Sequence, residues 1–299
     1  MDLNYVLNIL SRNDITIDLY FTKKDRNGYM SYSPNVSQNI IDNLTEGAKD
    51  YIEKFIDFEV IEYNPTGYRD NTFEVTTCDY VGNYNEIIES FDNGNIENVQ
   101  DEVNNFSFYC IDISTENENI KLIRRVTKFK KLYSKGIIAA FDGNILNKID
   151  DKILGMDGEI DIVILNNESI GVFNHISLER IFKLNDQFEI KASEALQVIK
   201  ATNTIHNYDM FEEDCLNDKR FQKILTKMLR EEGLNNCFDN FENIIETVGL
   251  FDLDIEIRSV PDKIIIYRDK GQIMDILRLA RDSYYKSTVR EKPGIDNKI

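Results

Sequence analysis

The segment with the greatest capacity for chemistry is residues 121–135, KLIRRVTKFKKLYSK, which holds seven Lys or Arg residues and no Asp or Glu. The whole chain of 299 residues has a formal net charge of −18, and residues 70–120 contain no Lys or Arg. Cations on a rigid element can bind nucleic-acid phosphates, because they displace condensed counterions. Alternatively, they pair with the acidic stretch before them or form a solvated face. Taken alone, the charge pattern favours this second interpretation.

Three carboxylates close together, Asp157, Glu159 and Asp161, could hold a metal ion. A metal-dependent nuclease needs an Asp on one strand and an acid with a Lys on the next strand. Glu189 and Lys191 have the right residue types, but a helix is expected there, and positions i and i+2 of a helix point apart. Asp161 lies on an apolar strand, where an unpaired carboxylate is costly. We therefore expect Asp161 to pair with a Lys or Arg, and a nuclease is the alternative.

Other catalytic patterns are missing from the sequence, which contains no phosphate loop, GxGxxG, GxSxG or HExxH motif. His175 and His206 are the two residues that could transfer protons near neutral pH without a perturbed pKa. A hydrogen-bonding role is expected for His175, which lies at a strand-to-helix turn. The four cysteines lack CxxC spacing and are expected to be reduced thiols in the core. The sequence thus favours a protein without catalytic activity, cofactor or metal.

The basic segment itself is predicted to be a strand over residues 120–126 followed by a short helix over residues 128–135. Thr127 can cap the start of this helix, and Gly136 can end it. Helical spacing places three lysines of the segment on one face, and the strand adds further cations. We call the seven cations of this segment the basic ridge: Lys121, Arg124, Arg125, Lys128, Lys130, Lys131 and Lys135.

The pattern of apolar residues predicts an α+β fold, with a mixed sheet of antiparallel hairpins packed by amphipathic helices and a smaller N-terminal α/β region. Asn166 and Asn167 predict a tight hairpin between strands at 160–165 and 168–173. A final helix is expected over residues 271–285. An acidic, turn-rich stretch ends near residue 104, so we expect an N-terminal acidic region over 1–104 and a second domain over 105–299.

The chain is expected to stay in the cytosol, because its first residues, MDLNYVLNILSRND, do not resemble a signal peptide. Its longest apolar runs have the length of strands, well below the roughly 20 residues that span a bilayer. Any association with a membrane is therefore expected to occur through a partner.

Four segments of the second half resemble the KwaB-like family of the Kiwa anti-phage defence system: FSFYCIDI, IRRVTKFKKLYSKGIIAAFDG, GEIDIVILNNESIGVFNHISLERIF and IMDILRLARDSYYKSTVREKP. The resemblance covers about residues 105–293. Its motif residues correspond to Asp161, Asn174 and Glu179, which we interpret as residues that maintain the fold. Leu178 stands where the family usually has Phe.

The resemblance implies a cytosolic effector that binds DNA, acts against incoming phage DNA and associates with a small multi-pass membrane protein, KwaA-like. It supplies no catalytic residue. With this resemblance, we expect the basic ridge to bind DNA. We also expect a homodimer that its partner recruits to the inner face of the cell membrane without direct insertion. A non-catalytic protein-interaction module, in which the acidic first half docks that partner, is a further alternative.

Overall fold

The computed structural model describes residues 1–26, 28–67, 69–94, 102–126, 139–142, 145–148, 154–259, 262–289 and 292–296. The chain divides into two compact units, and each is considered separately. Unit 1 comprises residues 1–63 and 69–184, and unit 2 comprises residues 64–68 and 185–299. Helices and mixed sheets with antiparallel strands make up the described residues, which confirms the predicted α+β class.

The elements of unit 1 are α1 (Leu3–Leu10), β1 (Thr16–Asp25), β2 (Gly28–Tyr32), α2 (Gln38–Ile52), η1 (Glu53–Phe55), β3 (Glu59–Glu62), β4 (Thr72–Thr77), η2 (Cys78–Tyr80), α3 (Tyr84–Asp92), η3 (Val103–Asn105), β5 (Phe106–Ser114), β6 (Asn119–Arg125), β7 (Ala139–Asp142), β8 (Ile145–Lys148), β9 (Ile162–Leu165), β10 (Ser169–Val172) and α6 (His175–Ile181).

Eight of these strands form one sheet in the order β2-β1-β5-β6-β9-β10-β4-β3. Neighbouring strands are antiparallel except β3 and β4, which are parallel. The β9–β10 hairpin turns at Asn166 and Asn167, whose φ angles of 52° and 57° suit a tight turn, as the sequence predicted. The sheet contains strands from both sides of the boundary expected at residues 104 and 105. That boundary falls inside η3, just before β5, whereas the two compact units separate after Leu184.

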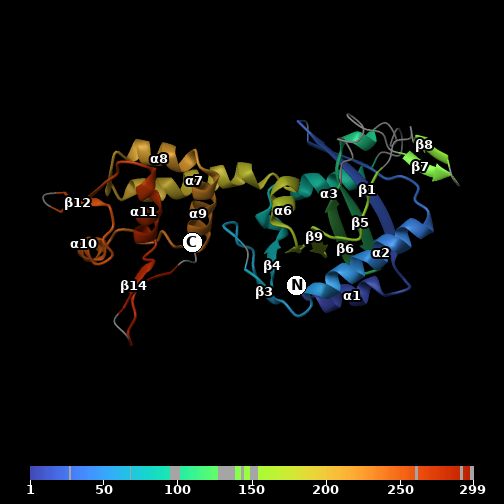
Figure 1. Ribbon diagram of the computed structural model, residues 1–299, viewed down its shortest axis with the longest axis horizontal. Coiled ribbons are helices and arrows are strands. Elements are labelled where there is room, and N and C mark those ends of the chain that lie inside the picture. Colours follow the sequence, from blue (N-terminus) through green and yellow to red (C-terminus); the bar gives the residue numbers. More distant parts are fainter. Residues whose placement is uncertain are drawn as a thin grey trace. The chain divides into compact units, whose positions relative to one another are not determined.

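Helices cover both faces of this sheet. On one face, α1 and α2 pack against alternate strand residues, including Leu19, Ile111 and Leu122, in one apolar cluster. On the other face lie α3 and α6, as the stacking of Tyr20 on Phe91 of α3 illustrates. Figure 1 shows central strands of the eight-stranded sheet between these two pairs of helices. Successive residues of a strand point to opposite faces, so each central strand buries apolar side chains in both directions.

The elements of unit 2 are α7 (Leu184–Ala201), which starts at the last residue of unit 1, β11 (Ile205–His206), α8 (Tyr208–Leu216), α9 (Lys219–Arg230), α10 (Phe241–Leu250), β12 (Glu256–Arg258), β13 (Ile264–Ile266), η4 (Lys270–Gln272), α11 (Ile273–Ala280), β14 (Tyr284–Lys286) and β15 (Pro293–Ile295). The helices and the three-stranded sheet β11-β13-β12 enclose a second apolar core.

The last helix is shorter than the sequence predicted. It was expected to continue to Tyr285, but α11 ends at Ala280, and Tyr284 and Tyr285 belong to strand β14. Asp282 adopts a φ of 55°, which turns the chain out of the helix. Tyr284 is still buried, because the strand carries it back over the core. Among the described residues, none of the helices combines the length and apolar character needed to cross a bilayer.

Candidate nucleic-acid interface

Three residues of the basic ridge lie in the part of the chain that the structure describes. They are Lys121, Arg124 and Arg125, all on β6. The other four, Lys128, Lys130, Lys131 and Lys135, lie outside the described residues, as does the helix predicted for them. The described part of the basic ridge therefore consists of side chains from β6.

Lys121 is an internal residue, with only 5% of its surface exposed. Its Nζ donates a hydrogen bond to Oδ1 of Asn119 and lies 3.4 Å from Oδ2 of Asp112, its partner across the β5–β6 pair. A lysine held in this way neutralises a neighbouring carboxylate and cannot reach a ligand at the surface. The sequence prediction that Lys121 contributes to an exposed ridge is therefore corrected to an internal ion pair.

Arg124 is held by three carboxylates. Its Nε and Nη2 each lie 3.0 Å from one oxygen of Asp157 in a bidentate pair, and Nη2 also lies 2.5 Å from Glu159. Nη1 lies 3.1 Å from Asp161. Burial lowers the pKa of Arg124, but the hydrogen bond with Asp157 and the charges of the three acids raise it more, so the net pKa lies above its usual value. All three nitrogen atoms of its guanidinium group bind carboxylates of the protein, so we do not retain Arg124 as a DNA contact.

Asp161 explains why this network is needed. Its side chain is 1% exposed, so an unpaired carboxylate there would be very costly. One oxygen binds Arg124, and the other accepts a hydrogen bond of 2.8 Å from the backbone N–H of Arg125. The Asp161 backbone carbonyl accepts from the N–H groups of Phe173 and Asn174, which ties β9 to the start of α6. The basic partner expected from the sequence is therefore Arg124.

The same geometry weakens the nuclease alternative. Asp157, Glu159 and Asp161 all direct oxygens to the guanidinium of Arg124, whose charge occupies the place that a divalent cation would need. No group of three or more His, Cys, Asp or Glu residues suited to a metal ion occurs within the described residues. We therefore do not propose metal-dependent cleavage.

Arg125 faces the opposite way from Arg124, because successive strand residues alternate between the two faces of the sheet. Arg124 follows Leu122 on the face covered by α1 and α2, whereas Arg125 lies on the face of α3 and α6. Its partner across the strand pair is Phe108, whose ring lies 6.4 Å from that of Tyr29. Arg125 thus belongs to a different set of contacts, which the sequence did not reveal.

We call this set the Tyr29 cluster: Lys24, Tyr29, Arg125, Arg180 and Lys183. The Nζ atoms of Lys24 and Lys183 lie 5.7 and 5.0 Å from the centre of the Tyr29 ring, as in cation–π contacts. The Tyr29 hydroxyl donates to the carbonyl of Ile181 at 2.5 Å, and Lys24 donates to the carbonyl of Arg180. Lys24 and Tyr29 therefore cap the C-terminus of α6 and hold its cations in place.

The remaining three cations of the Tyr29 cluster have no carboxylate within salt-bridge distance among the described residues. Arg180 is exposed, and Arg125 and Lys183 are half-buried. Partial burial, followed by the positive charge of Arg180, lowers the pKa of Arg125 below its usual value. The Arg125–Arg180 repulsion is therefore part of the folded state, and an anion bound between these two side chains would relieve it.

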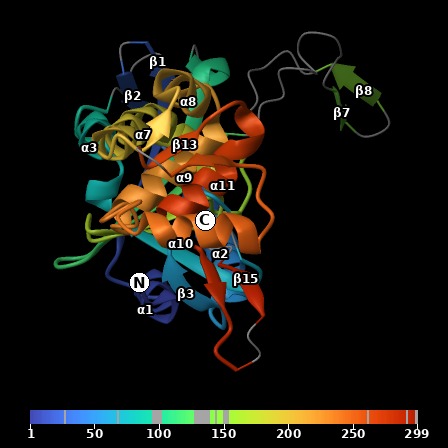
Figure 2. The same ribbon diagram turned by 90° about the vertical axis from the view of Figure 1, so that its left-hand side faces the viewer.

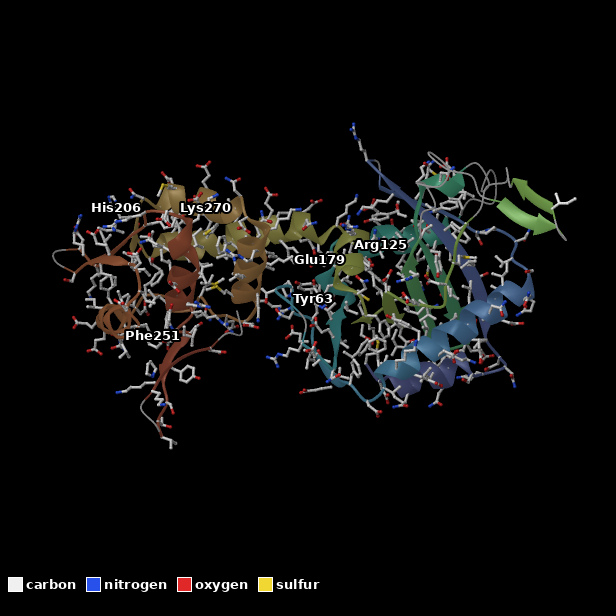
Figure 3. All side chains as sticks on the ribbon, in the orientation of Figure 1. Tyr63, Arg125, Glu179, His206, Phe251 and Lys270 are labelled. Carbon is white, nitrogen blue, oxygen red and sulfur yellow. The ribbon has the colours of Figure 1, made fainter. Side chains whose placement is uncertain are left out.

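The other motif residues, Asn174 and Glu179, have contacts inside unit 1. Asn174 caps α6, and its Oδ1 accepts from the N–H of Ser177 at 3.0 Å. The Tyr63 hydroxyl donates to Glu179 at 3.4 Å, and both residues, with Arg125, are labelled in Figure 3. His175 begins α6 with Nε2 2.9 Å from the buried carboxylate of Glu74, which agrees with the expected hydrogen-bonding role.

The fold and site define an α+β protein with a cationic cluster on one unit. The model of the family described as Kiwa protein KwaB-like matches residues 103–290, more than half of the chain, and the chain belongs to this family. It is thus a protein of the Kiwa anti-phage defence system. Comparison with curated proteins and with solved structures gives no match.

Proposed function

We propose that this chain is a DNA-binding effector of Kiwa defence, and that it holds the phosphate backbone of DNA with Arg125, Arg180 and Lys183. The observation that supports this proposal is the Tyr29 cluster. It gathers cations from β6 and the end of α6 without a carboxylate within salt-bridge distance of these three among the described residues. We also propose that the basic ridge residues outside the described part of the chain, which follow Arg125 in sequence, contribute to DNA binding.

The negative charge of the rest of the protein restricts DNA binding to the cationic surface. A protein of net charge −18 repels nucleic acid at long range, so binding must depend on a local concentration of cations. Lys24 and Tyr29 hold the end of α6, which reduces the conformational entropy that Arg180 and Lys183 lose on binding. Contacts of this type set affinity without reading bases, so we expect little dependence on DNA sequence.

We propose that the protein acts in the cytosol as a homodimer, and that a KwaA-like membrane protein recruits it to the inner face of the cell membrane. A dimer would double the cationic surface that one DNA duplex can contact. Membership in the Kiwa family supports a role beside other components of the same defence system.

The decisive experiment replaces the three cations with glutamine in the full chain: Arg125→Gln, Arg180→Gln and Lys183→Gln. Binding of a short fluorescent DNA duplex is followed by anisotropy over a range of salt concentrations. If each side chain contacts one phosphate, the slope of log K against log salt becomes shallower by about 2.7, and affinity near 0.1 M salt falls by as much as about 500-fold. The substitution at Arg125 keeps the backbone N–H that binds Asp161, so the fold should be retained.

A matched control is Lys54→Gln with Arg69→Gln. Both residues are exposed cations of unit 1, and Lys54 also lies over a tyrosine ring, 5.5 Å from the centre of Tyr51. The control removes positive charge outside the Tyr29 cluster and should leave most of the binding. An equal loss for each charge removed in the control and in the triple variant would show that total charge, and not the Tyr29 cluster, determines binding. A native protein that does not bind DNA at all would overturn the proposed function.

A further inference from the structure

Unit 2 carries a two-stranded hairpin, β14 and β15, which we call the arm. Its strands pair in the register Tyr284 to Ile295, Tyr285 to Gly294 and Lys286 to Pro293. In the described sheets, these two strands pair only with each other. Figures 1 and 2 both show β14 and β15 leading away from the helices of unit 2. The arm therefore exposes both faces over most of its length.

The base of the arm is firmly anchored. Tyr284 is 8% exposed, its ring lies 4.7 Å from that of Phe251, and its hydroxyl donates to Asp275 at 2.8 Å. The N–H of Asp296 donates to the carbonyl of Ser283 at 2.7 Å, which extends the strand pairing below Tyr284. Because its base is part of the core of unit 2, the arm has a defined direction and little conformational entropy to lose on binding.

The exposed part of the arm has an unusual composition for a free hairpin. Tyr285 is 54% exposed and Val289 is 88% exposed, while Lys286 and Lys292 are both exposed. The Tyr285 ring lies directly over Gly294, because a Cβ at that glycine would come within 2.7 Å of it. The glycine thus lets the ring lie flat along the arm. A large aromatic ring and lysines held outward on a stiff hairpin are typical of a binding element.

The charges of the arm are directed outward on both faces. Lys286 and Lys292 have no carboxylate within salt-bridge distance among the described residues. Strand alternation places Lys286 on the face opposite Tyr285, while Lys292, whose carbonyl accepts from Ser287, lies on the Tyr285 face. A two-stranded ribbon with a cation on each face can contact two phosphate backbones at once, one on each side of the ribbon. A flat protein surface can contact DNA with one face only.

We propose that the arm enters a groove of duplex DNA, with Lys286 toward one of the phosphate backbones that border the groove and with Lys292 and Tyr285, which share the other face of the arm, toward the opposite backbone. This inference rests on the proposed function, since it assigns a second contact to the same ligand. Two paired strands lie about 4.8 Å apart, and the major groove, about 12 Å wide, accepts a two-stranded ribbon. The positive charge of Lys286 and Lys292 is complementary to the phosphates on both sides of the groove.

The test compares the full chain with the arm variant Lys286→Ala and Lys292→Ala, using the same fluorescent duplex. Loss of two phosphate contacts makes the slope of log K against log salt shallower by about 1.8 and lowers affinity near 0.1 M salt by about 60-fold. The matched control is Lys219→Ala with Lys263→Ala, two exposed lysines of unit 2 that lie outside the arm. The control has the same net charge as the arm variant and should keep the native slope.

A second variant, Tyr285→Ser, tests the ring without changing the charge. It should weaken duplex binding and leave the salt slope unchanged, because stacking and packing do not release counterions. Thermal unfolding of each variant verifies that the arm and core are intact.

The outcomes separate this inference from the proposed function. If the native chain binds DNA, the Tyr29 cluster variant loses binding, and the arm variant keeps both native affinity and native slope, then the arm inference is overturned and the proposed function stands. The arm inference is equally overturned if the Lys219 and Lys263 control binds as weakly as the arm variant. A native chain without DNA affinity overturns both. An arm that serves a protein partner instead would give native DNA binding in both arm variants, which also overturns the inference.

Discussion

The role assigned to Arg124 gives a quantitative prediction for the variant Arg124→Met. The substitution keeps a long apolar side chain and removes the guanidinium from three carboxylates. Asp161 is the costly partner, because it is 1% exposed and would keep the backbone N–H of Arg125 as its hydrogen-bond donor among the described residues. Breaking a buried pair in this way costs about 3–5 kcal/mol, and the surviving hydrogen bond places the expected value near 3 kcal/mol. Asp157 and Glu159 are about half exposed and add little.

The assay is urea unfolding of the full chain followed by circular dichroism, with hydrogen exchange to locate the effect. The loss of protection should be concentrated in β6 and β9, which Arg124 and Asp161 join, while unit 2 keeps its native protection. The double variant Arg124→Met with Asp161→Asn should be more stable than Arg124→Met alone, because it removes the negative charge of the buried Asp161 carboxylate that Arg124→Met leaves without its ion-pair partner.

Arg12 supplies the control for this prediction. It also pairs with two carboxylates, Asp14 at 2.6 Å and Glu118 at 2.7 Å, but its side chain is 43% exposed. Arg12→Met should therefore cost less than about 1 kcal/mol. If the two arginine variants lose equal stability, then burial of Asp161 does not determine the strength of the network, and our reasoning about Arg124 is wrong.

Two further predictions concern the stability of unit 1. Burial first, and then the charge of Asp18, raise the pKa of Tyr20 to about 12, and burial likewise raises the pKa of Tyr109, so the unfolded chain loses these protons first. Burial also raises the pKa of the Cys78 and Cys110 thiols, so the free energy of unfolding should begin to fall above about pH 8 and fall more steeply from about pH 10 to 12. A urea midpoint that does not change between about pH 10 and 12 would contradict the assignment for the tyrosines. Asn174→Ala removes the hydrogen bond to the N–H of Ser177 and should cost about 1 kcal/mol in the same urea assay. Ser37 precedes α2 without a side-chain capping bond, so Ser37→Ala should cost clearly less, and equal costs would argue against the cap.

Local sequence patterns were sufficient to predict much of the fold. Apolar residues predicted β6 and the β9–β10 hairpin, because a strand buried on one face requires alternating apolar residues and a strand buried on both faces requires a continuous apolar run. The α11 prediction was too long at its end, since Tyr284 satisfies the helical spacing but reaches the core from a strand. The pairing of N-terminal β1 with β5 in a single sheet was not predicted, because strand order depends on contacts between residues far apart in the chain.

Residue types and local spacing are enough to show that Asp161 needs a basic partner and that cations are concentrated after residue 120. Which of these cations remain available depends on how the folded chain packs. Strand alternation sends Arg124 to three carboxylates and Arg125 to the opposite face, although the two residues are adjacent and chemically identical. Lys24, Arg180 and Lys183 join Arg125 from segments that are distant in sequence, and such proximity arises only when the strands and α6 pack together.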